Sequence, residues 1–118
     1  MSRPQKTRYV CHLPEYSVFG PKGIKSNSLE RIILLIDELE TVRLIDHLGY
    51  TQEEAADQMN VARTTVQRIY NDARKKIATS LVEGKIIVIE GGEFTLCEEN
   101  TGRCLRPLRL RRGHGNNQ

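Results

Sequence analysis

Residues 51–70, TQEEAADQMNVARTTVQRIY, have the spacing of a helix-turn-helix, a pair of crossed helices that places its second helix in the major groove of DNA. The first helix has a clear start, because Thr51 and Glu54 are spaced to form a capping box. Its end is marked by Asn60, a residue that tolerates the left-handed backbone conformation of a short turn. The spacing therefore predicts two helices that are joined at Asn60.

The second predicted helix begins near Arg63 and has two distinct faces. Apolar residues recur at helical spacing and form a stripe for the core, namely Val66, Ile69, Tyr70, Ala73 and Ile77. The first turns of the opposite face carry the side-chain types that bind base edges and phosphates, namely Arg63, Thr64, Thr65, Gln67, Arg68 and Asn71. Arg74, Lys75 and Lys76 continue as a basic edge, where Lys75 is expected to hold a phosphate. Both the spacing and the chemistry indicate a recognition helix.

A plain pair of amphipathic helices with a solvated polar face is the alternative interpretation of the same residues. The DNA-binding interpretation is favoured because the capping box, the small residues Ala55 and Ala56 and the turn at Asn60 agree at fixed offsets. In addition, the exposed face lacks the alternating Glu and Lys of an ordinary solvated helix.

The length and charge of the chain set limits on its class. Its 118 residues have room for one compact domain, and a net charge of +3 is only mildly basic. Basic residues are concentrated at the two ends: the N-terminal tail has Arg3, Lys6 and Arg8 without an acid, and residues 101–118 contain five arginines and no acid. No stretch approaches the roughly 20 apolar residues of a membrane span, and the N-terminus lacks the apolar segment of a signal peptide. We therefore expect a cytoplasmic protein.

Residues before the helix-turn-helix are expected to supply an arm, a strand and a third helix. Pro, Gly and Ser in residues 1–28 predict an irregular basic arm. The apolar run at 32–36 fits a buried strand, although a helix from Ser28 would also accept it. We favour the strand because Asp37 and Glu40 would then cap a helix over about residues 38–47.

Residues after the recognition helix predict a small β-hairpin. Gly84 ends the helix, and two apolar runs, 85–89 and 93–97, flank Gly91 and Gly92. The sequence thus predicts a mainly α fold, with a three-helix helix-turn-helix core, a small β-hairpin and an irregular N-terminal arm. The expected division is an arm at 1–28, a helix-turn-helix domain with its hairpin at 29–97, and a basic, flexible tail at 98–118.

Taken together, these residues resemble UPF0251 (DUF134), a bacterial and archaeal family of small uncharacterised proteins predicted to bind DNA. The matching segments are RPQKTRYVCHLP near the start and the block from LIDELETVRLIDHLGY to EGGEF, and the resemblance covers roughly residues 2–95. The helix-turn-helix also resembles the promoter-reading region of sigma factors (sigma-70 region 4). That resemblance implies a DNA contact at Gln52 and a groove position for Arg63 to Arg68.

The cysteines raise the question of a cofactor. Members of the family often carry extra cysteines, which implies zinc or an iron-sulfur centre, but this chain has Lys6 where a first cysteine is expected and only Cys104 after Cys97. Cys11, Cys97 and Cys104, with His12 or His114, would supply enough ligands for tetrahedral zinc. Because no CxxC pair is present, ordinary thiols are the favoured interpretation and no cofactor is established.

The sequence therefore favours a sequence-specific DNA-binding protein that regulates transcription as a homodimer, with double-stranded DNA as its partner. Arg63 or Arg68 is best placed for guanine and Gln67 for adenine. Two alternatives stay open: a metal- or redox-responsive regulator using Cys11, Cys97 and Cys104, and a protein-interaction adaptor of the transcription machinery. We expect no enzyme, because no phosphate loop and no nucleophile–base pair is recognisable.

Overall fold

The computed structural model describes residues 8–97. In chain order the elements are β1 (Arg8–Val10), β2 (Val18–Phe19), the 3₁₀ helix η1 (Ser26–Ser28), β3 (Arg31–Leu34), α1 (Ile36–Val42), the π-helical turn η2 (Arg43–His47), α2 (Gln52–Met59), α3 (Arg63–Glu83), β4 (Ile86–Ile89) and β5 (Phe94–Leu96). The predicted mainly α class, with three helices and small strands, is confirmed. Among the helices of this range, none combines the length and the apolar character that a membrane crossing requires.

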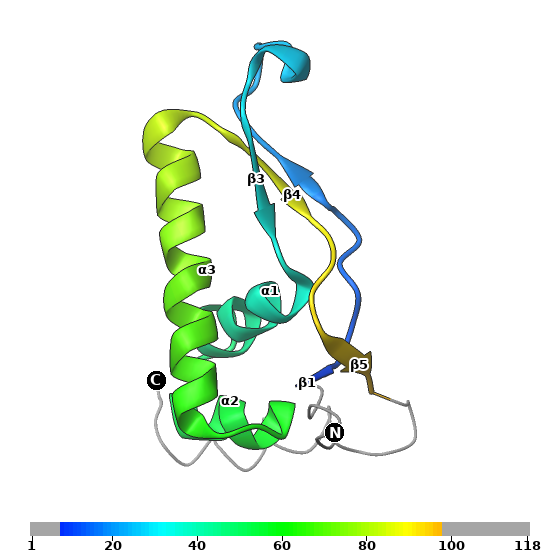
Figure 1. The fold of residues 1–118 in the computed structure, drawn as a ribbon, viewed down its shortest axis with the longest axis vertical. Helices are drawn as coiled ribbons and strands as arrows, with labels where there is room; N and C mark the ends of the chain where they lie inside the picture. The colour runs from blue at the N-terminus through cyan, green and yellow to red at the C-terminus, as the bar shows by residue number, and fades with distance from the viewer. Residues whose placement is uncertain (1–7, 98–118) are drawn as a thin grey trace, which may run out of the picture.

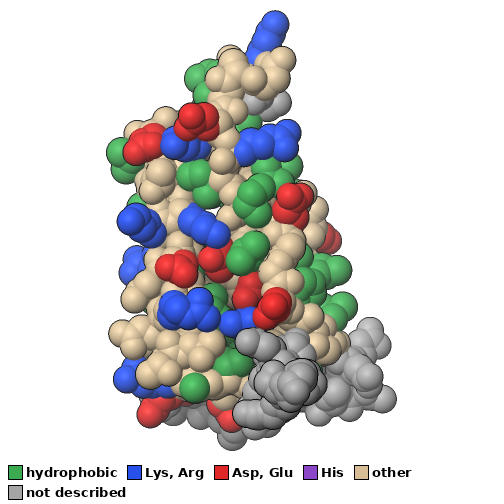
Figure 2. Space-filling model, in the orientation of Figure 1, with side chains coloured by type: hydrophobic (Ala, Val, Ile, Leu, Met, Phe, Trp, Pro, Cys, Tyr) green, Lys and Arg blue, Asp and Glu red, His purple; other side chains and the backbone are tan. Residues whose placement is uncertain are grey.

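The long helix α3 forms one side of the molecule, with α2 beside its first turns and α1 between α3 and the strands (Figure 1). Strands β2, β3 and β4 lie along the second half of α3, whereas β1 and β5 lie near α2. The same face in space-filling view carries mixed basic, acidic and apolar side chains (Figure 2). The crossing of α2 and α3 therefore lies at one end of the molecule and the larger sheet at the other.

The turn between α2 and α3 forms as its sequence predicts. The Thr51 hydroxyl accepts a hydrogen bond from the Glu54 amide at 3.0 Å, and the Glu54 carboxylate accepts one from the Thr51 amide at 2.9 Å. Asn60 ends α2 with φ 62° and ψ 46°, the left-handed conformation. Val61 then packs against the core of the three helices. Local chemistry thus fixes where one helix ends and the next begins.

Two apolar clusters form the core. The first joins the helices and consists of Leu44, Tyr50, Ala55, Ala56, Met59 and Val66. The second joins α3 to the larger sheet and consists of Leu34, Ala73, Ile87 and Ile89. The predicted apolar stripe of α3 is divided between them, with Val66 in the first and Ala73 in the second. A single helix therefore packs against both halves of the fold.

The predicted β-hairpin is wrong, because β4 and β5 belong to different sheets. β4 is the central strand of a sheet with the order β2-β4-β3, and β5 pairs with β1 in parallel. With β2 on one side and β3 on the other, β4 has no free edge for β5. Gly91 and Gly92 do adopt positive φ angles, 78° and 99°, but they serve a crossover between the two sheets.

The first helix also starts differently from its prediction. Leu35, not Asp37, is the residue before α1, and its amide donates to the Glu38 carboxylate at 2.9 Å. Asp37 and Glu40 are buried and do not cap the helix. Glu40 instead binds the Arg43 guanidinium through both oxygens, at 2.8 and 2.7 Å, which raises the pKa of Arg43.

The segment predicted as an irregular arm contains two strands. β1 pairs with β5 in the register Val10 to Leu96, and β2 pairs with β4 in the register Val18 to Val88. Strands this short gain most of their order from partner strands, so the local sequence with its Pro and Gly residues did not reveal them. The predicted basic tail at 98–118 lies outside the described residues.

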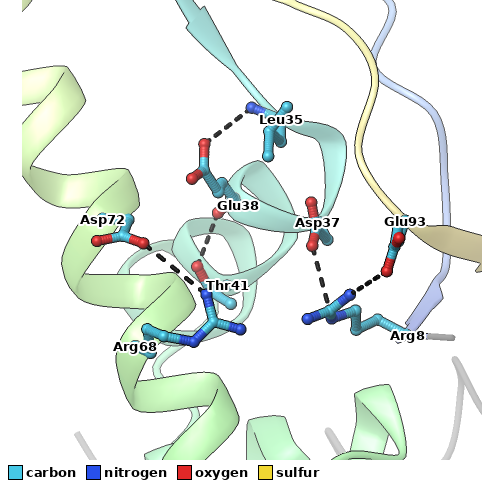
Figure 3. Close-up of polar contacts among 8 residues, drawn as sticks. All are labelled: Arg8, Leu35, Asp37, Glu38, Thr41, Arg68, Asp72 and Glu93. Atoms are coloured by element: carbon cyan, nitrogen blue, oxygen red, sulfur yellow. Dashed lines mark hydrogen bonds and ion pairs between the residues drawn. The ribbon is translucent and has the colours of Figure 1, made fainter. Parts of the chain in front are cut away.

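An ion network connects β1 to the start of α1 and to the residue before β5 (Figure 3). The Arg8 side chain lies 3.7 Å from an Asp37 carboxylate oxygen and 3.1 Å from a Glu93 oxygen. The buried Asp37 carboxylate also lies so close to Gly92 that a Cβ there would meet its Oδ1 at 2.6 Å. Burial raises the pKa of Asp37 more than the Arg8 charge lowers it.

We expect Thr51→Ala to lower the free energy of unfolding by about 1 kcal/mol, because it removes the acceptor that caps α2. Urea denaturation followed by circular dichroism measures the change. Thr64→Ala is the matched control, since Thr64 is exposed within the first turn of α3. Equal stability of the Thr51→Ala variant and the wild type would contradict the assigned role of the cap.

The raised pKa of Asp37 predicts a dependence of stability on pH. A carboxyl group whose pKa is higher in the folded state contributes stability below its unfolded pKa, and that contribution is lost as pH rises through the folded pKa. Asp37→Asn removes the ionisable group. The free energy of unfolding of the variant minus that of the wild type should therefore increase as pH rises from about 3 to about 7. Urea denaturation at several pH values tests this, and a difference that stays constant or falls would contradict it.

Candidate nucleic-acid interface

The close approach of α2 to α3 sets the position of the candidate interface. Ala55 is 0% exposed and Ala56 6%, and both lie in the cluster that contains Val66 of α3. Small side chains at a helix crossing let the two backbones come near each other. The buried residues of α3, which include Val66, Ile69 and Ala73, therefore face inward, and the opposite face of the helix points to solvent.

The solvent-facing side of α3 carries most of the predicted contact residues. Arg63, Thr64, Gln67, Arg68, Asn71 and Lys75 are all exposed. At about 100° per residue they lie within one face of the helix. Thr65 differs, since it is half-buried at the boundary with the core. The structure thus brings six of the seven predicted α3 residues together.

Gln52 joins this face from the start of α2. The Arg63 guanidinium donates a hydrogen bond to the Gln52 side-chain oxygen at 3.3 Å. Ala62, which precedes α3, offers no side-chain cap, so the first amides of α3 lack the acceptor that Thr51 gives to α2. The start of α3 therefore presents the Arg63 cation together with backbone N–H donors that no side chain caps.

Arg68 is held only loosely. Its guanidinium lies 4.0 Å from the Asp72 carboxylate, and both side chains are more than half exposed (Figure 3). Exposed ion pairs at this distance contribute little to stability. Arg68 can therefore leave Asp72 for a stronger hydrogen-bond acceptor without unfolding any part of the helix.

A polar cluster beside this face escaped the sequence analysis. The Tyr70 hydroxyl donates to the Asp46 carboxylate at 2.7 Å, and Arg74 lies 3.6 Å from the other Asp46 oxygen. The Arg74 guanidinium also lies over the Tyr70 ring at 5.3 Å. Burial and the Asp46 hydrogen bond raise the pKa of Tyr70. The hydroxyl of Tyr70 within an apolar stripe was the available clue.

This cluster gives Arg74 and Lys75 different roles. The Arg74 charge is engaged with Asp46 in η2, whereas no ion pair within residues 8–97 includes Lys75. Lys75 is exposed and continues the face that begins with Arg63. Of the predicted basic edge, Lys75 is therefore the cation that is best able to bind an external anion.

The described cysteines lie at the ends of paired strands. Cys11 follows Val10 and Cys97 follows Leu96, two residues that are in register, and the Cys97 amide donates to the Val10 carbonyl at 2.8 Å. Cys11 is buried, and the Gln58 amide donates to its sulfur at 3.2 Å. Within residues 8–97 no group of three or more potential ligands could hold a metal. Cys11 is disulfide-bonded and Cys97 is the free cysteine of this range, so the expectation of ordinary thiols is wrong for Cys11 and one thiol falls short of the four ligands of a structural zinc site. Cys104 lies outside the described residues.

Comparison with known proteins identifies relatives over most of the chain. A family model described as "Protein of unknown function DUF134" matches residues 1–97. A UPF0251 protein of Desulfitobacterium hafniense is 56% identical over 98 residues, which cover 83% of this chain and 78% of the relative. UPF0251 proteins of a Thermoanaerobacter species (46% over 114 residues, 97% and 100% covered) and of Methanococcus vannielii (38% over 102 residues, 86% and 78% covered) are also similar. No solved structure matches.

Proposed function

This chain belongs to the DUF134 family of proteins of unknown function, and we propose that it is a sequence-specific DNA-binding protein that regulates transcription in the cytoplasm. The observation that carries the proposal is the exposed polar face of α3, which α2 and the left-handed turn at Asn60 present to solvent. An α-helix fits the major groove of DNA, where each base pair has a distinct pattern of donors and acceptors.

The side chains on this face suggest a division of roles. Arg63 or Arg68 would bind the two acceptors of guanine, and Gln67 would bind the donor and acceptor of adenine. Thr64 and Asn71 would add shorter polar contacts, and the half-buried Thr65 would support the helix start. Lys75 and Gln52 lie toward the margins of the face, where phosphate oxygens would be the acceptors.

The proposed assembly is a homodimer on double-stranded DNA. One helix-turn-helix buries a limited surface, and binding at two half-sites multiplies its affinity. A binding protein is proposed instead of an enzyme because the residues gathered on this face are recognition types. A protein-interaction adaptor is the weaker alternative, since the face from Arg63 to Lys75 carries polar side chains and no large apolar one.

We expect Gln67→Ala to weaken binding to the preferred DNA site by about 1 to 3 kcal/mol and to relax base preference at one position. Lys75→Ala should weaken binding to all sequences alike and reduce the salt slope by about one. Selection of bound sequences from random DNA, followed by titrations at several salt concentrations, measures both effects, and a palindromic selected site would support the dimer.

Lys22→Ala is the matched control for these two variants, because Lys22 is an exposed lysine outside the helix-turn-helix. It should leave both site preference and salt slope unchanged. If the wild type selects no sequence, or if Gln67→Ala and Lys75→Ala bind like the wild type, the proposed role of α3 is wrong.

The metal- or redox-responsive alternative rests on the neighbouring positions of Cys11 and Cys97 and on the disulfide bond of Cys11, which favours its redox form. Elemental analysis of the purified protein, with Cys97→Ser as its control, tests the metal form of this idea. Stoichiometric zinc or iron that is lost in the variant would favour a metal-responsive regulator. A protein without stoichiometric metal would leave DNA binding alone as the proposed function.

A further inference from the structure

Strand β3 forms one edge of the larger sheet. It pairs in parallel with β4, and the carbonyls of Glu30 and Leu34 accept hydrogen bonds from Ile86 and Glu90 at 2.8 and 3.1 Å. Alternate residues of a parallel strand bond to the same neighbour. Glu30, Ile32 and Leu34 therefore bond toward β4, and the backbone groups of Arg31 and Ile33 point toward the opposite edge.

This edge is open in the described part of the chain. No strand of residues 8–97 pairs with β3 except β4, and no other backbone hydrogen bond in that range reaches Arg31 or Ile33. Arg31 is exposed, and 38% of the Ile33 surface is accessible to solvent. An open edge of this kind is a template for an added strand.

A groove runs beside the edge, between β3 and the second half of α3. Its lining consists of Ile32, Asp72, Lys75, Lys76, Thr79 and Lys85. In the space-filling view, apolar side chains lie along the middle of this face, with basic side chains on the α3 side (Figure 2). The side chains of a strand added to β3 would alternate between this groove and the outer face.

Two positive charges next to the edge have no partner in the described residues. Lys76 binds Glu38 at 2.7 Å, and Lys85 binds Glu30 at 2.8 Å and Glu83 at 3.1 Å. By contrast, no ion pair within residues 8–97 includes Arg31 or Lys75. A ligand with carboxylates at suitable spacing would neutralise both cations.

We propose that the β3 edge binds an extended acidic segment of a partner protein, which adds as a fourth strand. Its backbone pairs with the free N–H and C=O groups of Arg31 and Ile33. One apolar side chain of the segment lies in the groove against Ile32. Neighbouring carboxylates reach Arg31 on the outer face and Lys75 on the groove wall.

Two other occupants fit the charges less well. The tails of this chain are net basic: residues 1–7 have Arg3 and Lys6 and no acid, and residues 98–118 have five arginines against two acids, Glu98 and Glu99. A second copy that paired through its own β3 would need a two-fold axis beside Ile32. That axis would bring Lys75 of each copy toward its counterpart, because Lys75 lines the groove with Ile32.

The test uses the full chain and two capped synthetic peptides, the acidic VEVEVEV and the basic VKVKVKV. In two-dimensional NMR titrations, we expect VEVEVEV to shift the amide signals of Arg31 and Ile33 and to slow their exchange with solvent. VKVKVKV should bind at least about tenfold more weakly, because its lysines share one face of the extended strand and would face Arg31 when its valines fill the groove. Shifts that avoid β3, or equal binding of both peptides, would overturn the proposal.

Arg31→Glu should weaken VEVEVEV binding by about threefold to tenfold, whereas the charge-matched control Lys22→Glu should change it less than about twofold. Ile33→Pro removes one outward N–H without touching the bonds to β4, and should abolish binding.

If the chain without peptide is a dimer whose Arg31 and Ile33 amides are already protected, the edge belongs to a second copy and the acidic partner is excluded. DNA binding should survive both Arg31→Glu and Ile33→Pro, because neither residue lies on the proposed DNA face.

Discussion

The rest of the structure depends on the close packing of α2 against α3 at Ala55. This side chain has no solvent exposure and lies with Ala56, Met59 and Val66 in the cluster that joins the helices. A larger residue at the crossing would push the helices apart, since a packed core accommodates added volume poorly. The rotation of α3 about its own axis follows from this contact together with the left-handed turn at Asn60. The direction of the exposed face that begins at Arg63 is therefore set by the buried residues on the opposite side of α3.

Helix α1 connects this helical unit to the strands through buried acidic side chains. Glu38 accepts from both Leu35 and Lys76, Glu40 binds Arg43 and the Cys11 amide, and Asp37 lies beside Arg8. A buried carboxylate needs partners of this kind, because its desolvation is costly. Lys76 comes from α3, and Arg8 and Cys11 come from β1 and the residue after it, so the three acids set the relative placement of β1, α1 and α3 more specifically than apolar contacts alone would.

The parts of the fold that follow from local chemistry could be predicted from the sequence. The Thr51–Glu54 capping box, the turn at Asn60 and the end of α3 at Gly84 each depend on neighbouring residues, and each is confirmed. Strand pairing is different, because it is decided between distant segments. Gly91 and Gly92 have the backbone angles of a turn, yet nothing in residues 85–97 shows that β4 is already paired on both sides.

The same contrast holds for side chains. The exposed positions of Arg63, Gln67 and Arg68 could be read from helical periodicity, whereas the roles of Asp37 and Glu40 could not, because Arg8 and Arg43 decide them. Leu81 and Val82 are apolar residues of the last turns of α3, yet they are 77% and 84% exposed. Apolar character alone does not show on which side of the last turns the core lies, and here Ser80 takes the buried position and donates to the Lys85 carbonyl.

The 21 residues of α3 make a rod about 31 Å long, with the polar face near Gln67 at one end and the groove beside β3 at the other. Such a rod acts as a lever. A tilt of only about 5° about its Gly84 end would displace its first turn by roughly 3 Å, about the length of one hydrogen bond. A slight change in how the sheet supports α3 would thus be amplified into a displacement of the polar side chains at the N-terminal end of the helix.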